Sequence, residues 1–204
     1  MMADQDLPST TDLHVCHGAS TAERVRSYNL IGHAHELTFS CFRRLSLLNR
    51  DRTRRWFVDA MDAARGKHSL SLWAYVIMPE HVHVLLWPRL PGYEVRLIRT
   101  SLKVPVQRRA LRFLRQQAAG FLERLKDVQP NGEVHYRFWQ RGGGYDRNVT
   151  ESDTLLHMIE YIQNNPVRRG LVQKATDWVW SSARFYDGEH RVPIRMDPLP
   201  SLDT

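Results

Sequence analysis

Two histidines, His81 and His83, stand one residue apart at the start of an apolar run that ends at Trp87. A β-strand alternates its side chains between two faces, so both imidazoles should leave the same face. Their Cα atoms would then be roughly 7 Å apart, a separation from which both rings can converge on one metal ion. The spacing alone leaves an alternative open, in which one or both are ordinary, partly buried histidines on a sheet.

The remaining hydrophobic patterns predict a mixed α/β domain. Pro79 and Glu80 separate two apolar runs, which indicates two strands joined by a turn, or one strand with a kink. A long helical segment should break near Pro105, because proline lacks an amide donor and disfavours a helical residue before it. The expected elements are strands over 30–40, 70–78, 81–87 and 134–139, and helices over 53–65, 93–126 and 151–165.

The helix over 151–165 carries a second group of polar side chains. Helical spacing of four places Tyr161 and Asn165 on one face, together with His157. This face is rotated away from the apolar stripe, so the phenol should not simply be buried with the core. A phenol can attack phosphorus if a metal polarises the phosphate. The alternative is a tyrosine packed at the helix edge and an asparagine that caps the helix before Pro166. The apolar stripe consists of Leu155, Ile159 and Ile162.

The chain is strongly basic, with a net charge of +7 and a sequence pI near 9.8. Between Val95 and Lys126 it has nine Lys or Arg residues and a single acid, Glu123. Such an excess favours a polyanionic partner and phosphate contacts, although a solvated helix face is the alternative. The residues of this stretch that we expect to bind DNA are Arg96, Arg99, Lys103, Arg108, Arg109 and Arg112.

Composition excludes several other classes of protein. A hydrophobic content of 42% argues against wholesale disorder. No apolar run reaches about 18 residues, so no membrane span is expected, and the polar start argues against a signal peptide. Two cysteines, Cys16 and Cys41, do not make a disulfide framework, which favours a reducing cytosol.

A second histidine pair, His33 and His35, offers an alternative metal site. If it faced His81 and His83 across the sheet, four histidines could hold zinc and support a hydrolase. Structural zinc sites usually include cysteine, and neither cysteine is suitably placed in the sequence.

Several segments taken together resemble one known family. The strand and histidine motif are in 74–86, the tyrosine helix and the loop after it in 160–172, and a tryptophan-serine signature in 178–182. Segments 138–140 and 145–147 are similar to the part of the family that precedes the helix. These residues resemble the single-tyrosine HUH transposases acting on single-stranded DNA, and among them the REP-associated tyrosine transposases.

The resemblance implies a ferredoxin-like α/β fold with a central antiparallel sheet and helices packed on it. It implies Mg²⁺ or Mn²⁺ held by His81, His83 and Asn165. Attack by Tyr161 would leave a 5′-phosphotyrosine link and a free 3′-hydroxyl, which can rejoin strands. The partner would be single-stranded hairpin DNA, contacted also by Arg168 and Arg169. The protein would be a monomer or homodimer in the cytoplasm, associated with the nucleoid. A hairpin DNA-binding regulator without turnover is the alternative.

The resemblance covers residues 28–187. We expect a flexible N-terminal tail over 1–27, an irregular C-terminal tail over 188–204, and a basic helical insert over about 93–127 inside the domain. Gly142, Gly143 and Gly144 lack the context of a phosphate-binding loop, so we interpret them as a hinge.

Overall fold

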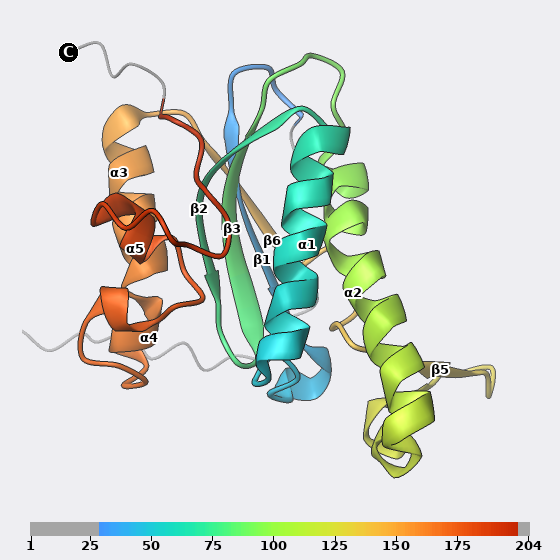
Figure 1. The fold of residues 1–204 in the computed structure, drawn as a ribbon. Helices are drawn as coiled ribbons and strands as arrows, with labels where there is room; N and C mark the ends of the chain where they lie inside the picture. The colour runs from blue at the N-terminus through green and yellow to red at the C-terminus, as the bar shows by residue number, and fades with distance from the viewer. Residues whose placement is uncertain (1–28, 200–204) are drawn as a thin grey trace, which may run out of the picture.

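The computed structural model describes residues 29–199, so the predicted tail over 1–27 lies outside the described residues. The described chain is a mixed α/β domain (Figure 1). In chain order, its elements are β1 (Ala34–Ser40), η1 (Phe42–Arg44), α1 (Asp51–Lys67), β2 (Leu70–Ile77), β3 (His81–Pro88), α2 (Val95–Gln117), η2 (Ala119–Leu125), β4 (Lys126–Val128), β5 (Val134–Tyr136), β6 (Tyr145–Val149), α3 (Ser152–Gln163), α4 (Asn165–Arg168), η3 (Ala175–Asp177) and α5 (Ala183–Tyr186).

The central sheet has four strands in the order β2-β3-β1-β6, and each neighbouring pair is antiparallel. Helix α1 connects β1 to β2, and α2 lies between β3 and β6, so the unit reads β-α-β-β-α-β. This is the ferredoxin-like arrangement, and it confirms the expected fold. The two apolar runs are separate strands joined by a turn, in which the Met78 amide donates to the His81 carbonyl at 2.9 Å.

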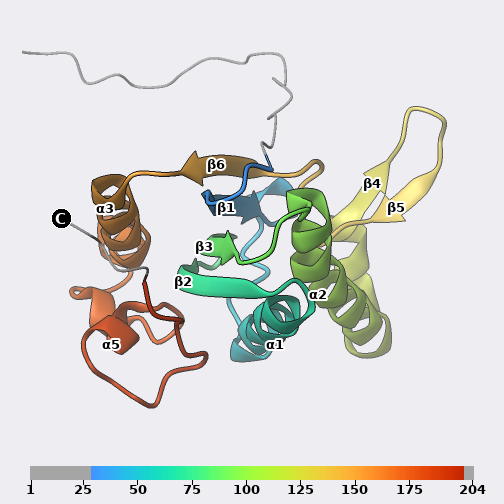
Figure 2. The same cartoon turned by 90° about the horizontal axis from the view of Figure 1, so that it is seen from above.

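Helices cover both faces of this sheet, and Figure 2 looks along the strands with α3 on one side and α1 and α2 on the other. The alternation of β3 divides its residues between the two layers. Val82, Val84 and Leu86 join the larger core under α1 and α2. Leu85 joins the smaller core under α3, the side on which the histidines also lie. The sheet therefore lies between α2 and the histidine pair.

Helix α2 is continuous through Pro105, so the predicted break is wrong. The proline ring costs roughly 3 kcal/mol in a helix interior. Ile98, Leu102 and Val106 are almost completely buried in the main core. Burial of each such side chain contributes about 1.5–3 kcal/mol, which outweighs the defect. The basic segment is thus the second crossover helix of the sheet, packed into its core.

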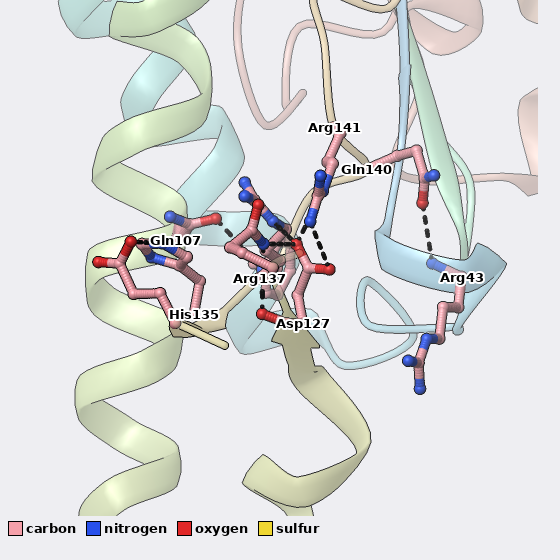
Figure 3. A network of polar contacts seen from close by, with 10 residues as sticks. Arg43, Gln107, Asp127, His135, Arg137, Gln140 and Arg141 are labelled. Carbon is pink, nitrogen blue, oxygen red and sulfur yellow. Dashed lines mark hydrogen bonds and ion pairs between the residues drawn. The ribbon is translucent and has the colours of Figure 1, made fainter. Parts of the chain in front are cut away.

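A clamp around Asp127 holds the segment that leads into β6, as Figure 3 shows. Arg141 donates two hydrogen bonds of 2.9 Å to the Asp127 carboxylate, and Arg137 donates another. These contacts hold the pKa of the Asp127 carboxyl well below its usual range, and the hydrogen bonds from Arg141 contribute more than the one from Arg137. The pairing of β4 with β5 brings these residues together, although the expected strand over 134–139 shrinks to Val134–Tyr136.

Gly144 follows this clamp and has a positive φ of 80°. A Cβ atom at this position would lie 2.1 Å from the Thr38 carbonyl oxygen of β1. The glycine is therefore required by a close approach of two strands, which is a different role from the hinge that we expected. Strand β6 itself was not among the predicted elements, because its sequence is mostly polar.

The C-terminal segment is irregular, as predicted, but it packs against the domain as far as residue 199. Ile194 and Met196 are buried in the main core. The Asp197 amide donates to the Leu72 carbonyl, and the Leu72 amide donates to the Asp197 carboxylate. This segment therefore covers part of the free edge of β2. In the described range 29–199, no helix is long and apolar enough to cross a membrane.

Candidate functional site

His81 and His83 leave the same face of β3, as the spacing predicted. Their rings are nearly perpendicular, with centroids 5.0 Å apart. Both side chains are buried, with 6% and 7% of their surface exposed. The strand register sets Ser40 of β1 opposite His81 and Thr38 opposite His83, so β1 supplies the neighbouring polar side chains.

Each imidazole is oriented by a carboxylate on its Nδ1 side. His83 Nδ1 lies 2.8 Å from Glu36 Oε1, and His81 Nδ1 lies 3.2 Å from Glu80 Oε1. Burial, with the adjacent charge of His83, lowers the pKa of His81 to about 4. A neutral imidazole whose Nδ1–H donates to a carboxylate keeps its Nε2 lone pair for a metal ion. The two carboxylates therefore hold both rings in an orientation suited to metal ligands.

Asn165 completes this group from the segment after α3. Helix α3 ends at Gln163, and Asn165 begins the short helix α4, so the expected single helix to residue 165 is wrong at its end. Asn164 keeps a helical conformation at the junction, which carries Asn165 on toward the sheet. Asn165 Nδ2 lies 3.4 Å from His83 Nε2, and the amide turned over would present its oxygen at this place.

Tyr161 lies on the polar face of α3, away from the buried stripe, as predicted. Its side chain is 42% exposed, and its ring centroid is 5.9 Å from that of His83. The Arg168 guanidinium carbon lies 4.8 Å from the centroid of the tyrosine ring. The phenol is therefore open to solvent beside the histidine pair and under a positive charge.

Two adjoining hollows meet at Tyr161, Thr38 and His83. One hollow, of about 380 Å³, is also lined by His81 and Asn165. The other, of about 700 Å³, contains His157 as well, which confirms that the polar residues of α3 share a face. Tyr161 thus stands between a space next to the histidines and a larger space over β1 and β6. The further lining residues of the smaller hollow are Ser40, Arg44, Arg168 and Arg169.

The donor set can hold a divalent cation. Two imidazoles and an amide oxygen leave coordination positions for water and phosphate oxygens, which Mg²⁺ and Mn²⁺ accept. Among residues 29–199, no group of three His, Cys, Asp or Glu side chains is arranged to hold a metal ion. Any three-ligand site here must therefore use a neutral residue such as Asn165.

The four-histidine zinc alternative is wrong. His35 is an odd-numbered residue of β1, so it points to the face opposite Thr38 and the His81–His83 pair. Its ring nitrogens lie 2.9 Å from Asp146 Oδ1 and 2.9 Å from the Tyr93 hydroxyl. The His33 ring lies 3.1 Å from the Asn148 amide.

The eight basic residues predicted to bind DNA fall into two groups. Arg168 and Arg169 line the hollow beside the histidines, where Arg169 also pairs with Glu80 at 3.0 Å. The other six are on α2, across the sheet. Of these, Lys103 donates to the Gly142 carbonyl at 2.9 Å. Arg96 and Arg109 form ion pairs with Glu94 and Asp59, and Arg99 packs at Gly143.

Arg44 is a site residue that sequence reasoning missed. It lines the smaller hollow with His81, and both Arg43 and Arg44 have positive φ values, 53° and 57°. Strain of this kind in residues other than glycine often accompanies functional positions. The Arg43 amide donates to Gln140 Oε1 at 3.1 Å, which braces the turn (Figure 3). The alternation of Glu36, Thr38 and Ser40 was a usable signal for the polar strand face, but nothing local marked Arg44.

A curated protein and a solved structure resemble this chain. No family model matches the chain. It is 25% identical over 148 residues to a Haemophilus influenzae protein assigned as a REP-associated tyrosine transposase, covering 67% of this chain and 76% of that protein. The solved structure of a REP-associated tyrosine transposase bound to a REP hairpin superposes with a TM-score of 0.59, at 19% identity, over 88% of this chain and 95% of that one. A Deinococcus radiodurans transposase structure gives a TM-score of 0.41 at 20% identity, over 71% and 97% of the chains.

Fold and site together define a ferredoxin-like domain with an HUH-type histidine pair and a tyrosine carried on a neighbouring helix. Within that class, the curated relative and the superposed structure are REP-associated tyrosine transposases, which confirms the resemblance predicted from the motifs.

Proposed function

We propose that this protein is a metal-dependent transposase of the REP-associated tyrosine type, which cleaves and rejoins single-stranded hairpin DNA. One observation carries the proposal: Tyr161, His83 and Asn165 meet at one hollow from elements about eighty residues apart in the sequence. The structural neighbour is bound to a REP hairpin, which supports hairpin DNA as the substrate class.

His81, His83 and Asn165 would hold Mg²⁺ or Mn²⁺. When bound, the ion would polarise a phosphate oxygen and stabilise the charge of the transition state. Glu36 and Glu80 fix the imidazole rings, and the buried position of both rings keeps them in one orientation. Arg44, Arg168 and Arg169 line the same hollow, so three guanidinium groups are available to position the phosphodiester.

The proposed reaction begins when the Tyr161 oxygen attacks phosphorus. A tyrosine O–P bond forms and the P–O3′ bond breaks, leaving a 5′-phosphotyrosine. The phenol loses its proton and the departing 3′ oxygen gains one. One phosphodiester is exchanged for another, so no external energy source is needed. A 3′-hydroxyl that attacks the phosphotyrosine reverses these changes, joins two strands and restores the phenol.

A covalent-adduct assay tests this function. Labelled hairpin oligonucleotides from the DNA flanking the gene are incubated with Mg²⁺ or Mn²⁺ and run on a denaturing gel. We expect a protein–DNA band that requires the metal and disappears in Tyr161→Phe and His81→Ala. Tyr145→Phe is the matched control, because Tyr145 is exposed and lines the larger hollow beside Tyr161. It should keep the band.

Two results would contradict the proposal. A band lost in Tyr145→Phe but kept in Tyr161→Phe would identify Tyr145, and not Tyr161, as the nucleophile. Metal-independent gel shifts with no covalent band in either metal would favour the hairpin-binding regulator without turnover.

A further inference from the structure

We propose that a groove between α1 and α2 is a second DNA site, which stacks unpaired bases of a single strand on its aromatic side chains. We call it the aromatic groove. Helices α1 and α2 cover the face of the sheet opposite α3 (Figures 1 and 2), and α3 carries Tyr161, so the groove lies across the sheet from the tyrosine. It encloses about 430 Å³. The lining residues used in the argument are Asn49, Arg50, Arg52, Trp56 and Phe113.

The groove offers the surfaces that non-specific single-strand binding requires. The rings of Trp56 and Phe113 lie 6.2 Å apart and are tilted, and both are only partly buried. The Arg52 guanidinium carbon stands 3.5 Å from the Phe113 centroid, so one face of this ring already holds a flat cation. A nucleobase is another flat group that can stack on the same rings. Asn49 adds a polar group that can reach a base edge.

Charge favours a polyanion over other occupants of this groove. Among the described residues that line it, two are arginines and none is acidic. Helix α2, which supplies Phe113, also exposes Arg108, Arg112 and Arg115. A second copy of this chain would place arginine against arginine, a juxtaposition that costs several kcal/mol. An apolar peptide would gain nothing from these charges, whereas each phosphate of a DNA strand would be attracted to them.

One loop connects the groove to the tyrosine site, and this step rests on the proposed function. Within residues 41–50, Arg44 lines the hollow beside His81, and Arg50 lines the groove. The Leu48 amide donates to the Pro79 carbonyl at 2.9 Å, which fixes the loop to the β2–β3 turn. Six residues span at most about 20 Å, a length that about six phosphates cover in a strand stacked at the duplex spacing of about 3.4 Å, and fewer in an extended strand. Bases within about six nucleotides of the cleaved phosphate would therefore reach the groove.

Equilibrium binding with matched variants tests the groove. Each variant also carries Tyr161→Phe, so that affinity is measured without covalent capture, and the probe is a fluorescent single-stranded oligonucleotide. Phe113→Leu keeps an apolar side chain but removes the aromatic face, and Arg52→Gln removes the stacked cation. Arg55→Gln is the control, because Arg55 is exposed on the same helix but does not line the groove.

We expect Phe113→Leu to raise Kd by about 5-fold to 150-fold, the range for loss of one stacked base. Arg52→Gln should also raise Kd, and Arg55→Gln should stay within about twofold because it loses only distant charge. Thermal unfolding checks that the variants are folded. Equal Kd values for Phe113→Leu and Arg55→Gln, in folded proteins, would overturn the inference.

Photo-crosslinking gives a second readout. An oligonucleotide with one 5-iododeoxyuridine, moved along the strand, should crosslink to the peptides with Trp56 or Phe113 when the base is within about six nucleotides of the cleavage point. Crosslinks confined to the Tyr161 face would contradict the groove. Self-association that Phe113→Leu abolishes, with unchanged DNA affinity, would assign the groove to a second copy instead.

The two proposals fail separately. A metal-dependent covalent band with no effect of Phe113→Leu on Kd would leave the tyrosine chemistry standing and remove the groove. Crosslinks in the groove without a covalent band would support the groove and remove the tyrosine chemistry.

Discussion

Replacement of Gly144 by alanine should destabilise the domain far more than the same replacement at Gly142. Both glycines have left-handed φ values, 80° and 85°, so alanine carries a similar backbone penalty of about 1–2 kcal/mol at each. At Gly142 an added Cβ would meet no atom within 4 Å. At Gly144 it would lie 2.1 Å from the Thr38 carbonyl oxygen and 3.2 Å from Phe39 Cβ. The difference between the two variants isolates the contact between strands.

The magnitude follows from that contact. Real Cβ atoms essentially never approach a heavy atom closer than 3.0 Å, so β1 and the start of β6 must separate. Overpacking of this kind costs about 1–3 kcal/mol beyond the backbone penalty. Gly144→Ala should therefore lose about 2–5 kcal/mol, and Gly142→Ala about 1–2 kcal/mol. The covalent-adduct rate should fall with Gly144→Ala as well, because Thr38 lies in both hollows beside Tyr161.

Urea unfolding followed by tryptophan fluorescence measures this difference. With a slope of about 1–3 kcal/mol per molar urea, the midpoints of the two variants should differ by about 1 M. Equal midpoints would refute the reasoning, because they would mean that β1 and β6 do not approach as closely as the structure places them.

Three further results are expected. Burial, with the nearby charge of Arg99, lowers the pKa of Lys103 from 10.5 to about 8, so at pH 7 its charge destabilises the folded state. The free energy of unfolding of Lys103→Met should thus exceed that of the unmutated protein by up to about 3 kcal/mol below pH 8. In urea unfolding this difference should disappear as pH rises from 8 to 10.5. A difference that stays constant over this range would contradict the lowered pKa of Lys103. Met196→Ala should lower the free energy of unfolding by about 2–5 kcal/mol, because the buried C-terminal segment is part of the core; a loss below 1 kcal/mol would show that it is not. Arg109→Gln should change the free energy of unfolding by less than about 1 kcal/mol, since its ion-pair partner Asp59 is exposed. A larger loss would show that this ion pair stabilises the fold.

Much of the candidate site was readable from periodicity. The alternation of β3 placed His81 and His83 on one face, and helical spacing separated Tyr161 from the apolar stripe of α3. The direction of a side chain follows from the local backbone conformation, so it can be predicted without knowing which residues the strand or helix contacts. The end of α3 was less readable, because Asn164 keeps a helical conformation and its amide still donates to the Glu160 carbonyl, although α3 ends at Gln163.

Other features depend on contacts that are distant in the sequence. Pro105 stays inside a helix because Leu102 and Val106 are buried against the sheet. A polar segment becomes β6 because β1 pairs with it, and Arg44 reaches the hollow because its turn is braced by Gln140. Propensity in a short window carries none of this information.

The sequence by itself determined most of the longer helices and strands, the shared face of the two histidines, the solvent-facing tyrosine and the resemblance to REP-associated tyrosine transposases. Only the tertiary structure decided which of the basic residues accompany that tyrosine. Arg168 and Arg169 lie beside it, whereas α2 packs on the opposite face and lines a separate groove. The physical reason is that an excess of basic residues does not specify where a helix packs. The right-handed β-α-β crossover decides the side of the sheet on which α2 lies, and burial of its apolar residues holds it there.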